Sequence, residues 1–366
     1  MNHRRQVHGG DAVYKEYKMK HLKLFIVLLL VGAINAGPVS KENDEDEIIT
    51  FTKEFYLTNF IMYNAKHDVV NIIVPTNSLN FDESKMTEDE ENMEQFFKNL
   101  ILFFVEADVD AAGNRMDKGL YVYKNGKATK LLENGRDAAA SSDDSTDVFF
   151  GAKDGIYIYD NKTNTAVKYG SVTDDIIAIA KENGTDVIYY LNKDHELYKV
   201  TDNGQKNVKI EDVVGAQEIV LDTANNLYFY TEDKQAYVVN DNSVKKITGL
   251  PENPKYVKLI KPPVLEDGVV FLSDNAFYVI YSNGTSELSD FRIASKAKPS
   301  AYGMEATFVQ FYAFHKKIYK YNLLEILSGD IFENLNKFLE ENEEIIRNES
   351  PVSISSTRKI KKHKQI

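Results

Sequence analysis

The sequence contains no cysteine, and only 8 of its 366 residues are proline. Without cysteine the chain has no disulfide bonds, no thiolate metal ligands and no cysteine nucleophile. Small exported domains usually depend on disulfides, but a chain of this length can be stabilised by its own core. With 43% hydrophobic residues and 19 glycines, the composition is typical of a globular protein rather than a disordered or collagen-like one.

Long apolar runs are also scarce. One extends from Leu24 to Ile34, follows two lysines and leads to small residues ending at Ala36. This arrangement is typical of a secretory signal peptide, and the run is too short to cross a membrane, which takes about 20 residues. We therefore expect residues 1–36 to be removed and the protein to be secreted and extracellular, with no membrane span. Met19 is an alternative start, which would make the residues before it an upstream extension.

The formal net charge is −12, which disfavours a nucleic-acid partner because an acidic surface repels the phosphate backbone. The charge is unevenly distributed along the chain. The segment 37–54 is acidic, and the tail 351–366 is basic. We expect the acidic segment to be solvated and the basic tail to be disordered.

Tyrosine is abundant, with 22 residues, and six tyrosines recur at intervals of 36 to 41 residues. Each lies in a short run of alternating character, such as GIYIYD, and another strand-like run precedes it by about ten residues. These six are Tyr121, Tyr157, Tyr198, Tyr237, Tyr278 and Tyr319. Because they recur in phase, we expect them to pack between repeated units rather than to bind a ligand.

One repeat, from Asp174 onward, divides into four strands, DDIIAIA, DVIYYLN, ELYKVTD and NVKIED. An Asn-Gly pair separates the last two, and Asn-Gly between alternating runs is a strong hairpin signal because a type I′ turn needs positive φ at both central residues. Four short antiparallel strands, repeated six times, predict an all-β fold, a six-bladed β-propeller. A β-sandwich would give no reason for the tyrosines to remain in phase.

We expect the propeller to span residues 55–328. The run from Phe55 to Asn64 is predicted to complete the last blade, which avoids an open sheet edge; the alternative is a seventh blade built from Phe60 to Pro75. A capping box at Thr87 to Glu90 predicts a short helix inserted in the first unit, and apolar spacing predicts a C-terminal helix over residues 329–350.

Residues suited to catalysis or metal binding are few. Outside the leader and the tail, the histidines are His67, His195 and His315, which lie on different units. No serine-hydrolase, zinc-protease, P-loop or dinucleotide-binding motif is present. We therefore predict no catalytic residue, no metal and no cofactor, and do not expect an enzyme. Sequons in exposed turns make three residues candidates for N-glycosylation: Asn161, Asn183 and Asn283.

The repeats resemble the insect ommochrome-binding proteins, most specifically in DGIYIYDNKTNTA and more loosely from about Leu100 to Leu327. Members of that family are secreted haemolymph carriers of tryptophan-derived phenoxazinone pigments. The resemblance implies a secreted carrier whose partner is a small-molecule aromatic pigment or a related metabolite. The sequence departs from the family in having no cysteine near the expected mature N-terminus. We expect a monomer.

Propellers bind ligands at the mouth of the central channel, which is formed by the starts of the innermost strands and by the turns between second and third strands. A planar aromatic ligand with amino-acid groups needs stacking rings and a few charged partners. The candidate ligand-binding residues at these positions are Asp175, His195, Gln217, Tyr256, Lys258, Tyr302 and His315.

Two other functions remain open. Calcium-dependent lactonase-like hydrolases are also six-bladed and hold a metal on the axis with Glu, Asn and Asp, for which Glu218 and Asp175 are the obvious carboxylates here. A protein-interaction scaffold would instead present a flat face rich in aromatic and arginine residues.

Overall fold

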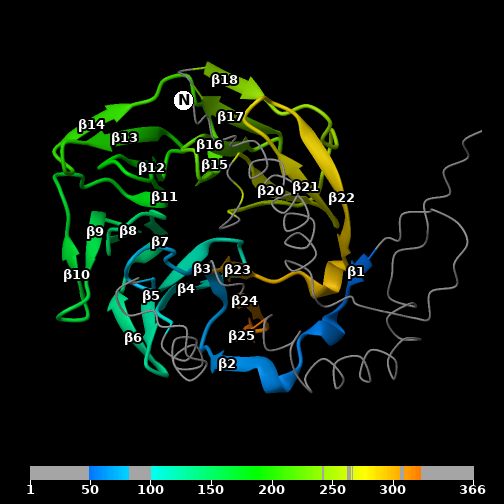
Figure 1. Cartoon of the computed structure of the whole chain (residues 1–366), viewed down its shortest axis with the longest axis horizontal. Helices are drawn as coiled ribbons and strands as arrows, with labels where there is room; N and C mark the ends of the chain where they lie inside the picture. Colours follow the sequence, from blue (N-terminus) through cyan, green and yellow to red (C-terminus); the bar gives the residue numbers. More distant parts are fainter. Residues whose placement is uncertain are drawn as a thin grey trace, which may run out of the picture.

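The computed structural model describes residues 49–81, 100–240, 243–261, 265, 267–305 and 309–322, which form a six-bladed β-propeller (Figure 1). Within these ranges the chain contains strands and short 3-10 helices but no α-helix. The helices expected after Thr87 and over residues 329–350 lie outside the described residues. The 3-10 helices are η1 (Lys53–Phe55), η2 (Thr58–Phe60) and η4 (Ser295–Ala297).

The blades are numbered here in chain order, and each is a sheet whose first strand lies innermost. Blade 1 consists of β3 (Val69–Ile73), β4 (Leu102–Val109), β5 (Arg115–Lys124) and β6 (Lys127–Leu132). Blade 2 consists of β7 (Gly135–Ala140), β8 (Val148–Ala152), β9 (Gly155–Asp160) and β10 (Thr165–Lys168). Blade 3 consists of β11 (Ile176–Lys181), β12 (Ile188–Asn192), β13 (Leu197–Thr201) and β14 (Lys206–Lys209).

The second half of the ring repeats this order. Blade 4 consists of β15 (Ala216–Leu221), β16 (Leu227–Thr231), β17 (Ala236–Asn240) and β18 (Ser243–Lys246). Blade 5 consists of β19 (Val257–Ile260), β20 (Val269–Ser273), β21 (Ala276–Ile280) and β22 (Ser286–Ile293). Blade 6 consists of β23 (Ala301–Met304), β24 (Val309–Phe314), β25 (Lys317–Asn322) and, from the beginning of the chain, β2 (Ile61–Asn64).

Strand β2 closes the ring by pairing antiparallel with β25, so that Tyr63 lies opposite Ile318. The prediction that the Phe55–Asn64 run completes the last blade is therefore confirmed, and the seven-bladed alternative is wrong. A further strand, β1 (Ile49–Phe51), pairs in parallel with β22 and gives blade 5 a fifth strand. It belongs to the segment expected to be acidic and solvated, and its pairing was not predicted.

Aromatic side chains fasten the chain between β1 and β2 to the last blade. The Phe55 ring stacks on Tyr321 with centroids 4.3 Å apart, and the Tyr321 hydroxyl donates to the Phe55 carbonyl at 2.6 Å. The Tyr56 ring stacks on Phe314 at 4.0 Å, and its hydroxyl donates to the Ala297 carbonyl at 2.8 Å. The closure therefore combines backbone pairing with buried aromatic contacts.

The hydrophobic core is divided into six clusters, one in each space between neighbouring blades. Every cluster contains one of the six phased tyrosines and an aromatic residue of the adjoining second strand. The register pairs are Tyr121 with Phe104, Tyr157 with Phe150, Tyr198 with Tyr190, Tyr237 with Phe229, Tyr278 with Phe271 and Tyr319 with Tyr312. The tyrosines thus occupy equivalent places between blades, as the sequence predicted.

The second-strand aromatics are deeply buried, at most 5% exposed. In each of blades 1 to 4 a lysine of the fourth strand lies opposite the phased tyrosine, a repeat that the sequence alone did not reveal. These lysines are Lys130, Lys168, Lys209 and Lys246. In blade 2 the Lys168 ammonium lies 4.7 Å from the Tyr157 ring centroid, a cation–π arrangement. In blade 1 the Lys130 ammonium lies 5.5 Å from the Tyr121 ring centroid in a similar arrangement.

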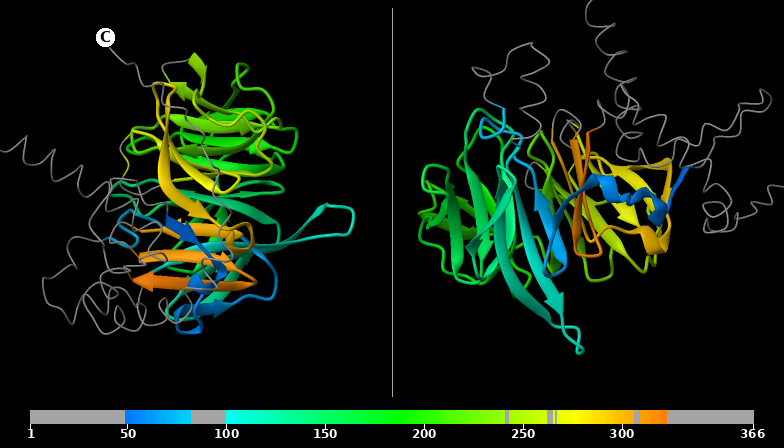
Figure 2. Two further views of the ribbon diagram at one scale, coloured as in Figure 1. Left: turned by 90° about the vertical axis from the view of Figure 1, so that its right-hand side faces the viewer. Right: turned by 90° about the horizontal axis from the view of Figure 1, so that it is seen from below.

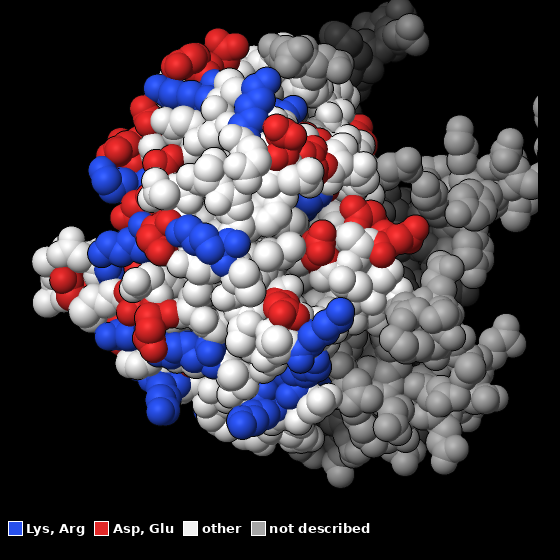
Figure 3. Space-filling model, turned by 90° about the vertical axis from the view of Figure 1, so that its left-hand side faces the viewer, with Lys and Arg blue, Asp and Glu red and all other residues white. Residues whose placement is uncertain are grey.

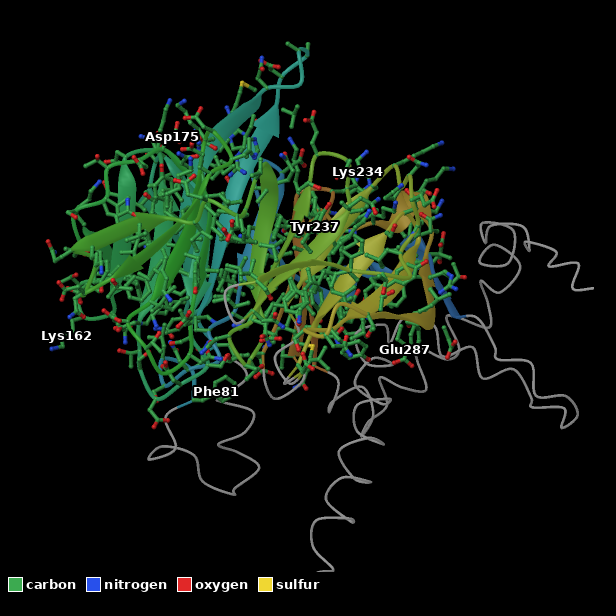
Figure 4. All side chains as sticks on the ribbon, turned by 90° about the horizontal axis from the view of Figure 1, so that it is seen from above. Phe81, Lys162, Asp175, Lys234, Tyr237 and Glu287 are labelled. Carbon is green, nitrogen blue, oxygen red and sulfur yellow. The ribbon has the colours of Figure 1, made fainter. Side chains whose placement is uncertain are left out.

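The ring has two distinct faces (Figure 4). The innermost strands start on one face, to which Asp175 and Lys234 belong, and end on the opposite face, where Phe81 and Lys162 lie. The β4–β5 hairpin projects beyond the other blades on the strand-start face (Figure 2). No described helix is long and apolar enough to cross a membrane. Acidic and basic side chains are intermingled on the side in Figure 3, and its described surface has no continuous basic patch suited to nucleic acid.

We expect the aromatic pairs to stabilise the interfaces between blades. Replacing Phe229, which is 2% exposed, by Ala should lower the free energy of unfolding by about 3–5 kcal/mol, because it leaves a cavity between blades 3 and 4. Tyr237→Phe should change it by less than about 0.5 kcal/mol, since the ring is kept. Urea denaturation of both variants measures the difference. Equal, small effects would contradict the assigned role of the pair.

We also expect the closure to loosen locally when Phe55 is replaced by Ala, because its ring packs on Tyr321 and Tyr312. Hydrogen exchange followed by mass spectrometry should show faster exchange in β2 and β25 and unchanged exchange in β12. Val167→Ala is the control, since Val167 is 49% exposed on β10. Uniform acceleration in every blade would show that the closure does not open as a separate unit.

Candidate functional site

A central channel of about 330 Å³ runs between the six innermost strands, and each of them contributes to its wall. A four-stranded blade twists, so that its innermost strand turns some side chains toward the axis instead of into the space between blades. In β3, β7, β11 and β15 a register irregularity adds to this effect by leaving one residue without a partner on the second strand. The unpaired residues Val70, Arg136, Ile177 and Gln217 all line the channel.

One register position on the inner strands carries much of the channel's polar chemistry. Blades 1 to 5 place residues of different character at this one register position, which are Asn71, Asp137, Ala178, Glu218 and Lys258. Blade 6 has Ala301 there, followed by Tyr302. The six blades therefore have the same backbone geometry, but the side chains that they place on the channel wall differ in charge and polarity.

Asp137 links three blades. It accepts hydrogen bonds from the Asn71 amide of blade 1, from its neighbour's N–H (Ala138, 2.8 Å) and from the Ile179 N–H of blade 3 (2.7 Å). Burial raises the pKa of Asp137 to about 7, against the opposite effect of these N–H donors. The carboxyl group is therefore poised to change its charge near neutral pH inside the channel.

Glu218 and Lys258 form an ion pair across the interface of blades 4 and 5, with Nζ and Oε1 2.5 Å apart. The other carboxylate oxygen of Glu218 accepts the Leu259 N–H at 3.2 Å. Burial alone would lower the pKa of Lys258, but the negative charge of Glu218 outweighs it and raises that pKa above its ordinary value. Lys258 faces the channel, since its side chain keeps 36% of its exposure.

Tyr230, Tyr256 and Tyr302 give the same side of the channel an aromatic surface. The Tyr302 ring packs against Tyr312 at 5.0 Å, and its hydroxyl contacts the Met304 sulfur at 3.1 Å. One face of Tyr256 lies under the Lys298 ammonium, which is 4.5 Å from the ring centroid. Burial raises the pKa of each of these phenols, so all three remain protonated hydrogen-bond donors at neutral pH.

The strand-start mouth carries a network of charges from blades 1 to 3. Arg136 pairs with Asp117 at 2.8 Å and with Asp175, and Arg115 pairs with the second oxygen of Asp117 at 2.8 Å. Both arginines line the channel, while the two carboxylates hold them in place. The network therefore presents guanidinium groups at the entrance with most of their charge already neutralised.

The strand-end face is held together by hydrogen bonds between the loops of successive blades. The Ser142 N–H donates to the Asn183 side-chain oxygen at 2.6 Å, and the Asn183 N–H donates to the Asn225 side-chain oxygen at 2.8 Å. The Asn183 amide also donates to the Thr223 carbonyl at 3.0 Å. Asn183 is thus engaged at both ends of its amide, whereas the other two predicted glycosylation residues, Asn161 and Asn283, are exposed.

The structure places four of the seven predicted ligand-binding residues on the channel wall: Gln217, Tyr256, Lys258 and Tyr302. Asp175 lies at the strand-start mouth and holds Arg136. His195 and His315 occupy left-handed positions in the turns between second and third strands, farther from the axis. The Nδ1 of His195 hydrogen-bonds the Ala216 carbonyl at 2.8 Å, and the His315 ring packs edge-on against Phe314.

Sequence reasoning missed Asn71, Asp137, Arg136 and Tyr230. The period that located the tyrosines could have found Asp137, because positions 137, 178, 218 and 258 are 40 or 41 residues apart. Tyr230 is identified by its place opposite Glu218 on the second strand. The polar residues in phase on the inner strands of blades 2, 4 and 5 were the available signal.

The raised pKa of Asp137 predicts a particular dependence of stability on pH. The unfolded carboxyl group ionises near pH 4, but the folded one stays protonated up to about pH 7, so the folded state loses stability as pH rises from about 4 to about 7. Relative to Asp137→Asn, the wild type should therefore lose unfolding free energy over this window and change no further above it. Urea denaturation at pH 4 to 8 measures this; a constant difference across the window would refute the shift.

No known protein family and no curated protein matches the sequence. Three solved structures are similar in fold. The RRP9 WD40 repeats match with a TM-score of 0.45 and 12% identity over 70% of this chain and 76% of that one. U3-55K matches with a TM-score of 0.43 and 12% identity, over 70% and 77%. PorZ, a surface component of the type-IX secretion system of Porphyromonas gingivalis, matches with a TM-score of 0.42 and 11% identity, over 60% of this chain and only 29% of that protein.

Proposed function

We propose that this protein is a non-enzymatic carrier that holds a small planar aromatic ligand in the central channel, an ommochrome-type pigment being the expected case. The observation that supports this most is the two-sided wall. Blades 4 to 6 supply the Glu218–Lys258 ion pair and three tyrosines, and blades 1 to 3 supply aliphatic side chains together with a few polar groups such as Asp137 and Arg136 but no aromatic ring. A volume of about 330 Å³ falls in the range of small-molecule sites, roughly 300–1,000 Å³. The expected signal peptide fits a carrier that works in an extracellular fluid.

The wall formed by blades 4 to 6 has hydrogen-bond donors that no described residue uses. The hydroxyls of Tyr230 and Tyr256 have no hydrogen-bond partner among the described residues, and the Lys258 ammonium has further donors beside the one used by Glu218. Such groups are suited to the ring carbonyl and phenol oxygens of a phenoxazinone, while the rings and the aliphatic wall cover its faces. Tyr230 and Tyr256 are only partly buried, so a ligand in the channel can accept hydrogen bonds from their hydroxyls.

A calcium-dependent hydrolase is the weaker candidate. Asn71, Asp137 and Glu218 do come together on the channel wall, which is the residue set that such an enzyme needs. The carboxylate oxygens of Asp137 and Glu218, however, already accept hydrogen bonds from Lys258 and from main-chain N–H groups. A cation would have to displace Lys258, and the described residues contain no cluster of three His, Asp or Glu side chains suited to a metal.

A protein-interaction scaffold is the second candidate, and it is favoured by the β4–β5 hairpin. Near the hairpin tip Val109 is 68% exposed and Met116 is 40% exposed, both unusual for apolar side chains on a projecting element (Figure 2). Isolated exposed apolar residues are nevertheless common on monomeric proteins. The channel chemistry therefore supports the carrier more strongly.

Removing the hydroxyl groups of Tyr230 and Tyr256 tests the proposal that the channel carries a pigment. The double variant Tyr230→Phe/Tyr256→Phe should bind xanthommatin about tenfold or more weakly, because each hydrogen bond contributes about 1 kcal/mol and 1.4 kcal/mol is tenfold in affinity. Its thermal stability should not fall, since the hydroxyls bond no described residue. The matched control is Tyr281→Phe, whose hydroxyl bonds Glu287 at 3.0 Å away from the channel wall. EDTA should not change the affinity of the wild type.

Isothermal titration of pigment into the three proteins, with and without EDTA, gives the answer. Equal affinity in the double variant and the wild type would place the pigment outside this channel. No binding to the wild type would refute the pigment carrier, and lactone hydrolysis that EDTA abolishes would establish the hydrolase in its place.

A further inference from the structure

The strand-end half of the channel contains two lysines that the pigment contacts described above do not involve. Lys181 is the last residue of β11, and Lys261 directly follows β19. Both line the channel, one from blade 3 and the other from blade 5. The two ammonium groups therefore belong to the same cavity although blade 4 separates their strands.

Lys181 is held rigidly. Its side chain is buried, with the residue 6% exposed, and its ammonium donates to the main-chain carbonyls of Glu182, at 2.6 Å, and Thr185. An ammonium has three hydrogens, so one donor remains. The loop that provides the two carbonyls is itself fixed by the Asn183 hydrogen bonds to Asn225 and Ser142. Lys181 thus offers a preorganised donor.

Lys261 has no hydrogen-bond or ion-pair partner among the described residues. Burial lowers its pKa to about 8, with the charge of Lys181 adding to this and the negative charges of Asp222 and Asp143 opposing it. Neither carboxylate pairs with a lysine among the residues that the structure describes. Asp222 accepts from Asn226 and Tyr228 and from the Gly268 N–H at 3.0 Å, and Asp143 accepts from the Gly184 N–H at 2.9 Å.

We propose that this end of the channel binds a carboxylate of the ligand through Lys261 and Lys181. A carboxylate would supply a counter-charge that no described residue gives Lys261 and would accept the remaining hydrogen of Lys181. The inference rests on the proposed function in so far as the same ligand fills the rest of the channel.

The spacing along the wall fits one molecule. Lys258 and Lys261 are three residues apart on an extended run, which amounts to about 10 Å. An aromatic body near Tyr230, Tyr256 and Lys258 can therefore extend a carboxylate to Lys261. The ligand class is a planar aromatic carboxylate, and its charged group points toward the strand-end face.

The test uses two planar probes with the same ring system, 2-naphthoate, which carries a negative charge, and 2-naphthamide, which is neutral. The wild type should bind the carboxylate about tenfold more tightly than the amide by isothermal titration. Lys261→Met keeps the length of the side chain and removes its charge, and it should abolish this preference without lowering Tm, because it removes a buried charge that has no described partner. Lys199→Met is the matched control, since Lys199 lies over the Tyr189 ring at 5.6 Å and does not line the channel; it should keep the preference.

Three results would overturn the carboxylate site: equal affinity of the wild type for both probes, an unchanged preference in Lys261→Met, or no binding of naphthoate. These outcomes are separate from the pigment experiment. Xanthommatin that binds the wild type and Lys261→Met equally would leave the carrier intact and refute this orientation. Naphthoate binding that depends on Lys261, in a protein that does not bind xanthommatin, would support the carboxylate site and refute the pigment.

Discussion

The pairing of β2 with β25 joins the two ends of the described chain and keeps the ring closed. An isolated four-stranded blade would expose both of its faces, and only its two neighbours can bury them. Each of the six apolar clusters therefore depends on the presence of the next blade, and the ring has no place at which it could end without exposing one. The Phe55, Tyr321 and Tyr312 contacts reinforce the closure where the chain has to meet itself.

The channel is a consequence of this closure. The six innermost strands surround one axis and leave a space between them. Residues from every blade line this space. Because the backbone geometry repeats while these residues do not, the wall can carry aromatic rings on one side and none on the other without any change of fold. The same frame could hold many different ligands, so the fold itself does not identify the function.

The polar residues of the channel fall into two groups. Asp137 and Glu218 accept main-chain N–H groups of the next blade, so they link neighbouring blades as well as facing the cavity. Tyr230, Tyr256 and Lys261 have no hydrogen-bond partner among the described residues, although burial shifts the pKa of each. All three residues are partly exposed and line the cavity, so donors that bond nothing in the described fold are available there to a ligand.

The sequence by itself determined the repeat, the phase of the six tyrosines and the closure by the Phe55–Asn64 run, because alternation and turn residues are local patterns. It did not determine the pairing of β1 with β22, since three residues carry no recognisable period. It identified Lys258 as a candidate site residue but not its pairing with Glu218, which lies 40 positions earlier and reaches it only because blades 4 and 5 pack together. His195 and His315 show most clearly what the sequence cannot determine. The sequence placed them on the correct face, but a turn between second and third strands lies farther from the axis by one or two strand spacings of about 4.8 Å, and only the tertiary structure decides that distance.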